Sequence, residues 1–172
     1  MKVLIAATLA LLAATPALAK DEAPCAKGTV CATDPPSIAG ALLKRGYQAL
    51  VSKDDSGDPM VESAANGYRF YVYFYGCEAN KLCDSLQFYA SFKNEEKRGV
   101  DFANAWNARK RFAQMSLDKE GALVMRYDVA TIGGLTQRNF GDVIDWWTTM
   151  LGAYDQFRAE NPVAKPAEAP KA

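Results

Sequence analysis

Four cysteines are the side chains in this 172-residue sequence whose type and spacing most clearly allow chemistry. Cys25 and Cys31 are six residues apart, and Cys77 and Cys83 repeat that separation. Four cysteines allow three connectivities, and the repeated spacing makes 25–31 and 77–83 the simplest pairing. A four-thiolate zinc site is the alternative, but structural zinc sites favour a C-x2–4-C spacing. We therefore expect two disulfides, no metal and no cofactor.

Patterns typical of catalysis are missing. The sequence contains no histidine, which excludes Ser-His-Asp and Cys-His nucleophile pairs and histidine metal sites. G-x-S-x-G, G-x-G-x-x-G and P-loop patterns are also absent. Lys plus Arg and Asp plus Glu both number 20, so the chain lacks the excess positive charge that attracts nucleic acid. We expect a protein that is not an enzyme and does not bind nucleic acid.

Three aspartates, Asp54, Asp55 and Asp58, could contribute oxygens to a calcium site. Calcium takes about six to eight oxygen ligands, which the usual loop spaces as D-x-D-x-D-G-x5-E. Here the aspartates are crowded together, and no distal glutamate follows in register. We expect a polar turn between two strands.

Tyrosines alternate along residues 68–76 (YRFYVYFYG), the segment with the strongest β-propensity. If Cys77 faces Cys83, this strand pairs with a strand at residues 85–92 in one register. The even-numbered face is then apolar and must be core, because a slip of one residue would bury the other face. The odd-numbered face is amphipathic; we call its six residues the tyrosine face: Arg69, Tyr71, Tyr73, Tyr75, Gln87 and Tyr89.

The tyrosine face is the candidate binding surface. Tyrosine combines a large contact area with a polar tip, which suits recognition of a partner. Two interpretations remain open: the face binds a ligand or partner, or a helix or a second protomer covers it.

A second candidate group, Asn104, Trp106 and Asn107, lies on a helix predicted over residues 101–113. Residues three apart share a helix face, so the asparagines point together while Trp106 points toward the core. The amides could cap a neighbouring strand or loop, or recognise a ligand.

A long final helix is expected from its N-cap, Thr136, to about Glu160. A second apolar set, Trp146, Met150 and Phe157, widens its apolar arc beyond one stripe. This set is either buried core or a contact face, for example of a homodimer.

The ends of the chain carry their own signals. A basic start, an apolar run over residues 3–14 and small residues up to Ala19 predict a secretory signal peptide (residues 1–19) cleaved after Ala19. The apolar run is shorter than the about 20 residues that span a bilayer, so we expect no stable membrane insertion. Three prolines and four alanines in residues 161–172 predict a disordered tail. An even number of cysteines in an exported chain fits the periplasm.

The elements that position these residues are short strands punctuated by helices. After an N-terminal disulfide loop (residues 20–34), one domain is expected over residues 35–160. Turn signals such as Asn66-Gly67 join neighbouring strands, so the sheet should be mainly antiparallel. We predict an α+β fold of five to six strands and three helices, ordered α-β-β-β-β-α-β-β-α, with the helices on one face. The predicted strands are residues 48–52, 60–65, 68–76, 85–92, 114–117 and 122–128.

Short motifs occur in a fixed order between about Ser37 and Phe157. They are Leu42-Leu43-x-x-Gly46-Tyr47, Gly57-Asp58-Pro59, Phe74-Tyr75-Gly76-Cys77, Cys83-x-Ser85-Leu86-Gln87-Phe88, Asn104-x-Trp106-Asn107, Arg111-Phe112, Leu117-Asp118 and Gly133-Gly134-Leu135-Thr136. Through them the chain resembles the YbjN-domain family of bacteria. The resemblance implies a fold like the type III secretion chaperones, a periplasmic branch of the family and a role in sensory-transduction regulation. It implies no catalytic residue.

These observations favour a non-enzymatic periplasmic binding module, chaperone-like or regulatory. We expect it to recognise an unknown protein or peptide partner on the tyrosine face or in a helix groove. One alternative is a small-ligand sensor with a pocket between sheet and helices near Trp106. The other is a structural or homeostasis protein of the envelope.

Overall fold

The computed structural model describes residues 25–92 and 98–163. The predicted signal peptide and most of the predicted tail lie outside these ranges. Within them, no helix combines the length and the apolar character needed to cross a membrane.

Six strands form one antiparallel sheet in the spatial order β2-β3-β4-β5-β7-β6. Their bounds are β2 Leu50–Lys53, β3 Pro59–Ala65, β4 Tyr68–Tyr75, β5 Ser85–Phe92, β6 Gln114–Leu117 and β7 Leu123–Ala130. Within residues 25–92 and 98–163, three helices accompany the sheet: α1 Pro35–Lys44, α2 Val100–Arg109 and α3 Gln137–Glu160. This confirms the predicted α+β class and element order. A small second sheet, β1 Thr29–Val30 with β8 Leu135–Thr136, was not predicted.

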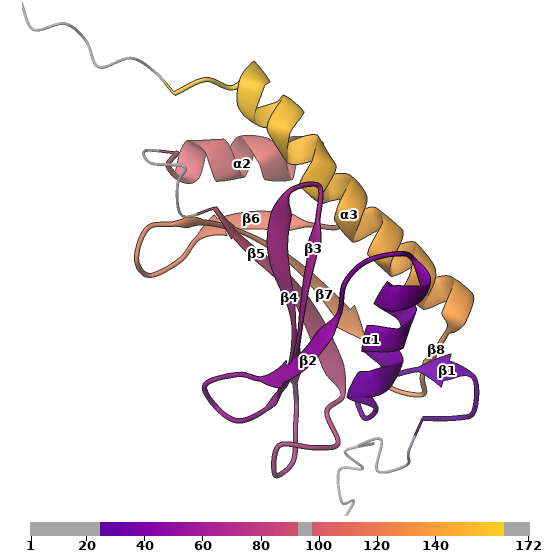
Figure 1. Ribbon diagram of the computed structural model, residues 1–172. Coiled ribbons are helices and arrows are strands. Elements are labelled where there is room, and N and C mark those ends of the chain that lie inside the picture. Colours follow the sequence, from indigo (N-terminus) through magenta and orange to yellow (C-terminus); the bar gives the residue numbers. More distant parts are fainter. Residues whose placement is uncertain (1–24, 93–97, 164–172) are drawn as a thin grey trace, which may run out of the picture.

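The helices build one core with one face of the sheet. In Figure 1, α3 runs diagonally along the molecule, with α1 beside its first half and α2 near its far end. Trp147 of α3 lies with its ring 5.7 Å from Phe70 and 5.6 Å from Phe88, both on the even-numbered face of β4 and β5. Such fully buried aromatic side chains supply much of the hydrophobic stabilisation. The even-numbered face is therefore the core face, as predicted.

The β4–β5 register also agrees with the prediction. Tyr71 pairs with Tyr89, Tyr73 with Gln87, and Tyr75 with Ser85. The register places all odd-numbered side chains of this hairpin on the side of the sheet away from the helices.

The predicted extension of the second helix to residue 113 is wrong, because α2 ends at Arg109. Trp106 Nε1 donates a hydrogen bond of 2.8 Å to the Ala113 carbonyl, and Phe112 takes the left-handed backbone conformation (φ 67°). These tertiary constraints turn the chain into β6. Leu43 of α1 is 58% exposed.

Candidate functional site

The tyrosine face lies on the side of the sheet opposite the helices. None of its six residues belongs to the buried core that the helices share with the sheet. Tyr71, Tyr73, Gln87 and Tyr89 are half-buried by their neighbours on the face. Arg69 is exposed, as is Tyr75, with 49% of its surface accessible. The three described helices thus leave this amphipathic surface open.

Aromatic contacts hold the tyrosines in a connected row. The Tyr71 and Tyr73 rings stack with centroids 5.9 Å apart, and Tyr89 meets Tyr73 edge-on at 5.6 Å. The Arg126 guanidinium lies 5.2 Å above the Tyr89 ring. Because such pairs fix ring orientation, the face is a preorganised platform that loses little conformational entropy on binding.

Polar and apolar residues from neighbouring strands complete the surface. On β7, Asp128 accepts a 2.7 Å hydrogen bond from Gln87 Nε2. Met60 of β3 pairs with Tyr73, and it is buried without belonging to the main core. Arg126 was expected to border the face, whereas Met60 and Asp128 were not predicted as site residues, because the sequence does not reveal which strands flank the β4–β5 hairpin. Side chains in β3 and β7 alternate between the two faces of the sheet. This alternation identifies site residues only once the strand order is known.

Partial burial raises the pKa of the Tyr73 hydroxyl, and the neighbouring Tyr89 and Tyr71 raise it further. Burial likewise raises the pKa of Tyr75, while Arg126 acts in the opposite direction. Both hydroxyls therefore stay protonated at neutral pH, where each can donate and accept hydrogen bonds. Tyr73 and Tyr75 thus present neutral polar tips rather than phenolate charges.

A shallow hollow of about 570 Å³ opens at one end of the face. Tyr75 and Gln87 line it from the hairpin, and Asp128 and Ala130 line it from β7. Its lining is largely apolar with one carboxylate, which suits a side chain or a short segment of a bound partner.

The group Asn104, Trp106 and Asn107 lies elsewhere and does not join the tyrosine face. Trp106 is fully buried and bonded to Ala113, so it contributes no open surface to a ligand pocket. The Asn107 side chain donates to the Met115 carbonyl at 2.9 Å and accepts from the Met115 amide at 2.8 Å. Asn104 is exposed. Trp106 and Asn107 thus have the structural role that was one of their two interpretations.

The second apolar set of α3, defined above as Trp146, Met150 and Phe157, is partly buried and partly exposed. Met150 and Phe157 are buried core residues, whereas Trp146 is 37% exposed and stacks on Phe112 at 4.4 Å. The three residues therefore do not form one contact face.

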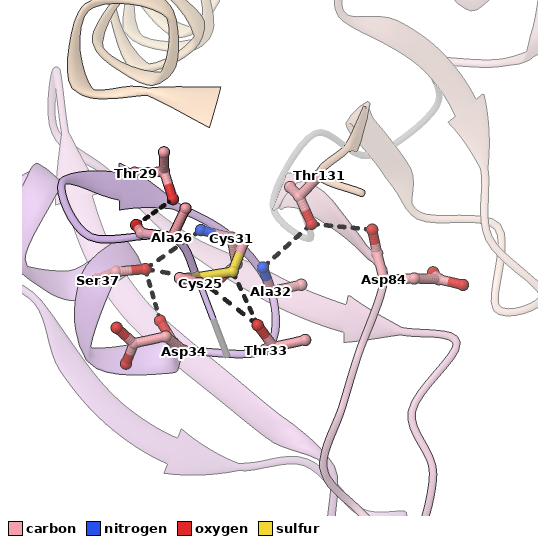
Figure 2. Close-up of a disulfide and its surroundings, with 10 residues drawn as sticks. All are labelled: Cys25, Ala26, Thr29, Cys31, Ala32, Thr33, Asp34, Ser37, Asp84 and Thr131. Carbon is pink, nitrogen blue, oxygen red and sulfur yellow. Dashed lines mark hydrogen bonds between the residues drawn. A yellow bond between two sulfur atoms is a disulfide. The ribbon is translucent and has the colours of Figure 1, made fainter. Parts of the chain in front are cut away.

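Both disulfides occur in the pairing that the spacing indicated, Cys25–Cys31 and Cys77–Cys83. Figure 2 shows how the first loop is anchored. The buried Thr131 hydroxyl accepts from the Ala32 amide at 3.0 Å and donates to the Asp84 carbonyl at 2.9 Å. Asp84 directly follows Cys83, so Thr131 links the two disulfide loops. No sequence pattern predicted this role for Thr131.

The aspartate segment forms the β2–β3 turn. The Asp54 carboxylate accepts hydrogen bonds from the amides of Ser56 and Asp58, at 2.9 and 3.0 Å. Asn80 donates to Asp58 and so ties this turn to the β4–β5 loop. Among the residues described, no group of three or more His, Cys, Asp or Glu side chains is placed to hold a metal ion.

Comparison with protein-family models identifies a relationship. Residues 34–158 match the model of the YbjN family, which is described as "Putative bacterial sensory transduction regulator". No curated protein matches the chain. The matched region includes the whole six-stranded sheet and therefore the tyrosine face.

Proposed function

The chain belongs to the YbjN family, and from that premise we propose that it is a non-enzymatic periplasmic binding module. It acts as a chaperone-like or regulatory protein. It recognises a segment of a partner protein, or a peptide, on the tyrosine face. No covalent step is involved.

The observation that carries this proposal is the open, preorganised row of tyrosines. An antiparallel sheet can leave one face to water, but such a face is usually polar. Here Tyr71, Tyr73, Tyr75 and Tyr89 occupy the open side and hold one another in place. Rigid aromatic side chains with polar tips are enriched at protein interfaces and dominate their binding energy. A recognition role accounts for this composition.

The shape of the surface favours an extended partner segment. The row crosses β4 and β5 and ends at the hollow beside Tyr75 and Asp128. A segment lying along the row would place one side chain in the hollow and stack others on the rings. A small-ligand sensor is the second candidate function, favoured by the same hollow rather than by a pocket near Trp106, whose side chain is buried.

The cysteines support the proposed compartment. Two disulfides fit an oxidising compartment such as the periplasm, since cytosolic thiols are kept reduced. The predicted cleavage after Ala19 is consistent with export. An antiparallel sheet with helices on one face also agrees with a fold like the type III secretion chaperones.

In-cell photocrosslinking tests the proposal. A benzophenone amino acid replaces Tyr75 in one variant and Leu43 of α1 in a matched control, because both side chains are well exposed, at 49% and 58%. We expect irradiation to give a discrete protein adduct from position 75 that is missing from position 43. Mass spectrometry of the adduct identifies the partner segment.

Two results count against the proposal. Equal adducts from both positions indicate random collision rather than recognition. No protein adduct from position 75, combined with a small metabolite that copurifies and protects the hollow, favours the ligand-sensor alternative.

A further inference from the structure

Three consecutive cations, which we call the basic corner, lie where α2 ends and the chain turns into β6: Arg109, Lys110 and Arg111. The charged group of each lies over an aromatic ring: Arg109 5.8 Å from the Phe157 centroid, Lys110 5.7 Å from Trp106 and Arg111 5.0 Å from Phe112. Such contacts hold a cation in place without neutralising it. Among the residues that the structure describes, no carboxylate forms an ion pair with any of the three. The corner therefore keeps its positive charge.

Two acidic residues of α3 next to Trp146 in helical spacing, Asp142 and Asp145, belong to a different surface. Both line a separate hollow together with Arg45 and Arg138. The Asp145 carboxylate accepts a 2.8 Å hydrogen bond from Arg45 Nε. These acids thus lie among cations of their own rather than beside the basic corner.

An exposed aromatic pair adjoins the basic corner. Phe112 takes the left-handed backbone conformation (φ 67°), which is costly for a bulky residue. Its ring stacks on Trp146 of α3 at 4.4 Å, and Trp146 is 37% exposed. A tryptophan at the surface beside arginine and lysine is the composition of proteins at a membrane–water interface, where the ring enters the headgroup layer and the cations meet anionic headgroups.

The cations are spread over a surface rather than gathered around one point. Arg109 lies over Phe157, whereas Arg111 lies over the Phe112 ring that stacks on Trp146. Trp146 and Phe157 are about 16 Å apart along the axis of α3, given the helical rise per residue. One carboxylate or phosphate cannot contact the whole of such an area, but a plane of anionic headgroups can. A hollow of about 540 Å³ between Lys110, Arg111 and Gln114 leaves room for one headgroup.

We propose that the basic corner and Trp146 dock this protein on the surface of an anionic phospholipid membrane. The cations meet the phosphate headgroups, Trp146 enters the headgroup layer, and no segment spans the bilayer. The docking surface belongs to the side of the sheet that carries the helices, where α2 ends beside α3 (Figure 1). The tyrosine face lies on the opposite side and therefore stays accessible to a partner. This inference does not depend on the proposed function of the tyrosine face.

Vesicle binding, followed by tryptophan fluorescence and by cosedimentation, tests the proposal. The chain has three tryptophans, and Trp106 and Trp147 are fully buried, so a blue shift on binding reports Trp146. The apolar run over residues 3–14 could bind vesicles by itself, so the exported form that begins at Lys20 is used. We expect binding with a blue shift on phosphatidylglycerol vesicles, none on phosphatidylcholine vesicles, and weaker binding as salt is added.

Two double variants with the same net charge separate the basic corner from general electrostatics. Arg109→Gln with Arg111→Gln should weaken binding to phosphatidylglycerol about 30-fold, because each cation at an anionic surface contributes about five-fold in affinity. Lys27→Gln with Lys53→Gln, at exposed positions on other elements, is the matched control and should bind as the wild type does. All four substituted residues of the corner and control are exposed, and thermal unfolding checks that both variants are folded.

A single variant isolates the tryptophan. Trp146→Phe should still sediment with phosphatidylglycerol vesicles but lose the emission shift. Sedimentation of the wild type without an emission shift would show that Trp146 stays in water, which contradicts the docking geometry.

Other results would overturn the proposal as a whole. The wild type does not bind phosphatidylglycerol vesicles at low salt, binds phosphatidylcholine equally well, or is matched in affinity by the Arg109→Gln, Arg111→Gln variant. Inorganic phosphate and an oligoglutamate peptide serve as further probes. Binding of either one at the corner, without binding of vesicles, would identify a free anion or an acidic protein segment as the occupant and reject the membrane.

Discussion

Asn104 and Asn107 are identical side chains one helical turn apart, yet only Asn107 bonds to the backbone of another element. Its amide oxygen and nitrogen satisfy both backbone groups of Met115, and the neighbouring Trp106 bonds to Ala113. Together these contacts hold Ala113 and Met115 against α2, which ends at Arg109. At the residue scale, the motif around Trp106 builds a corner of the fold.

Replacing the two asparagines separately measures this difference. Asn107→Ala leaves a partly buried amide and carbonyl without partners, which should lower the free energy of unfolding by about 1–3 kcal/mol. Asn104→Ala, at an exposed position, should change it by less than about 0.5 kcal/mol. Urea denaturation of both variants makes the comparison. Equal effects would show that the Met115 contacts do not matter for stability.

Alkaline pH should destabilise the folded protein through Tyr73 of the tyrosine face. The folded state holds the Tyr73 proton more tightly than the unfolded chain does, because burial and neighbouring tyrosines raise its pKa. The protonated Tyr73 hydroxyl therefore contributes fully to the free energy of unfolding below the ordinary tyrosine pKa of about 10. This contribution is lost as the pH rises through the higher pKa of the folded state. We expect the Tyr73→Phe variant to lose less stability at alkaline pH than the wild type. Tyrosinate absorbance and denaturation between neutral and strongly alkaline pH check this, and an identical decline in both proteins would contradict it.

At the element scale, the β4–β5 hairpin sets the geometry of the candidate site. Its register was predictable because the Cys77–Cys83 pair and the alternation of apolar residues require the same pairing. The end of α2 was not predictable, since it depends on hydrogen bonds to Ala113 and Met115 that form only in the folded chain. The flanking residues Met60 and Asp128 were also missed, because strand order is not encoded in local periodicity.

Removal of the hairpin disulfide should weaken the protein without changing its register. Cys77→Ser with Cys83→Ser opens a short loop, so the expected loss is about 2 kcal/mol. The apolar side chains of β4 and β5 still specify the same pairing. Amide hydrogen exchange should show both strands protected in the variant. Selective loss of protection in β5 would mean that the disulfide, rather than the core, fixes the register.

At the scale of the whole molecule, the sheet divides it into two unlike sides. The three described helices pack on one side (Figure 1). The other side presents the tyrosine face, none of whose residues belongs to the core. The fold class and the element order were predictable, because hydrophobic periodicity, glycine and proline mark each segment. The openness of the tyrosine face was not, since it depends on where the helices pack.

Export gives a prediction for the chain as a whole. Protein purified from a periplasmic fraction should begin at Lys20, and non-reducing peptide mapping should recover the Cys25–Cys31 and Cys77–Cys83 peptides. Retention in the cytosol with free thiols would contradict the proposed compartment. Linkage of Cys25 to Cys77 would contradict the disulfide pairing in the structure.

The most direct test of the recognition role compares partner capture by the wild type and a double variant, Tyr73→Lys with Tyr89→Lys. Both proteins, and a Leu43→Lys control with an equally exposed change on α1, are crosslinked in periplasmic extract under oxidising conditions. Circular dichroism and thermal unfolding first establish that all three are folded. The proposal predicts one protein that the wild type and the control enrich and the double variant loses. Enrichment of the same protein by the double variant would show that the tyrosine face does not recognise it.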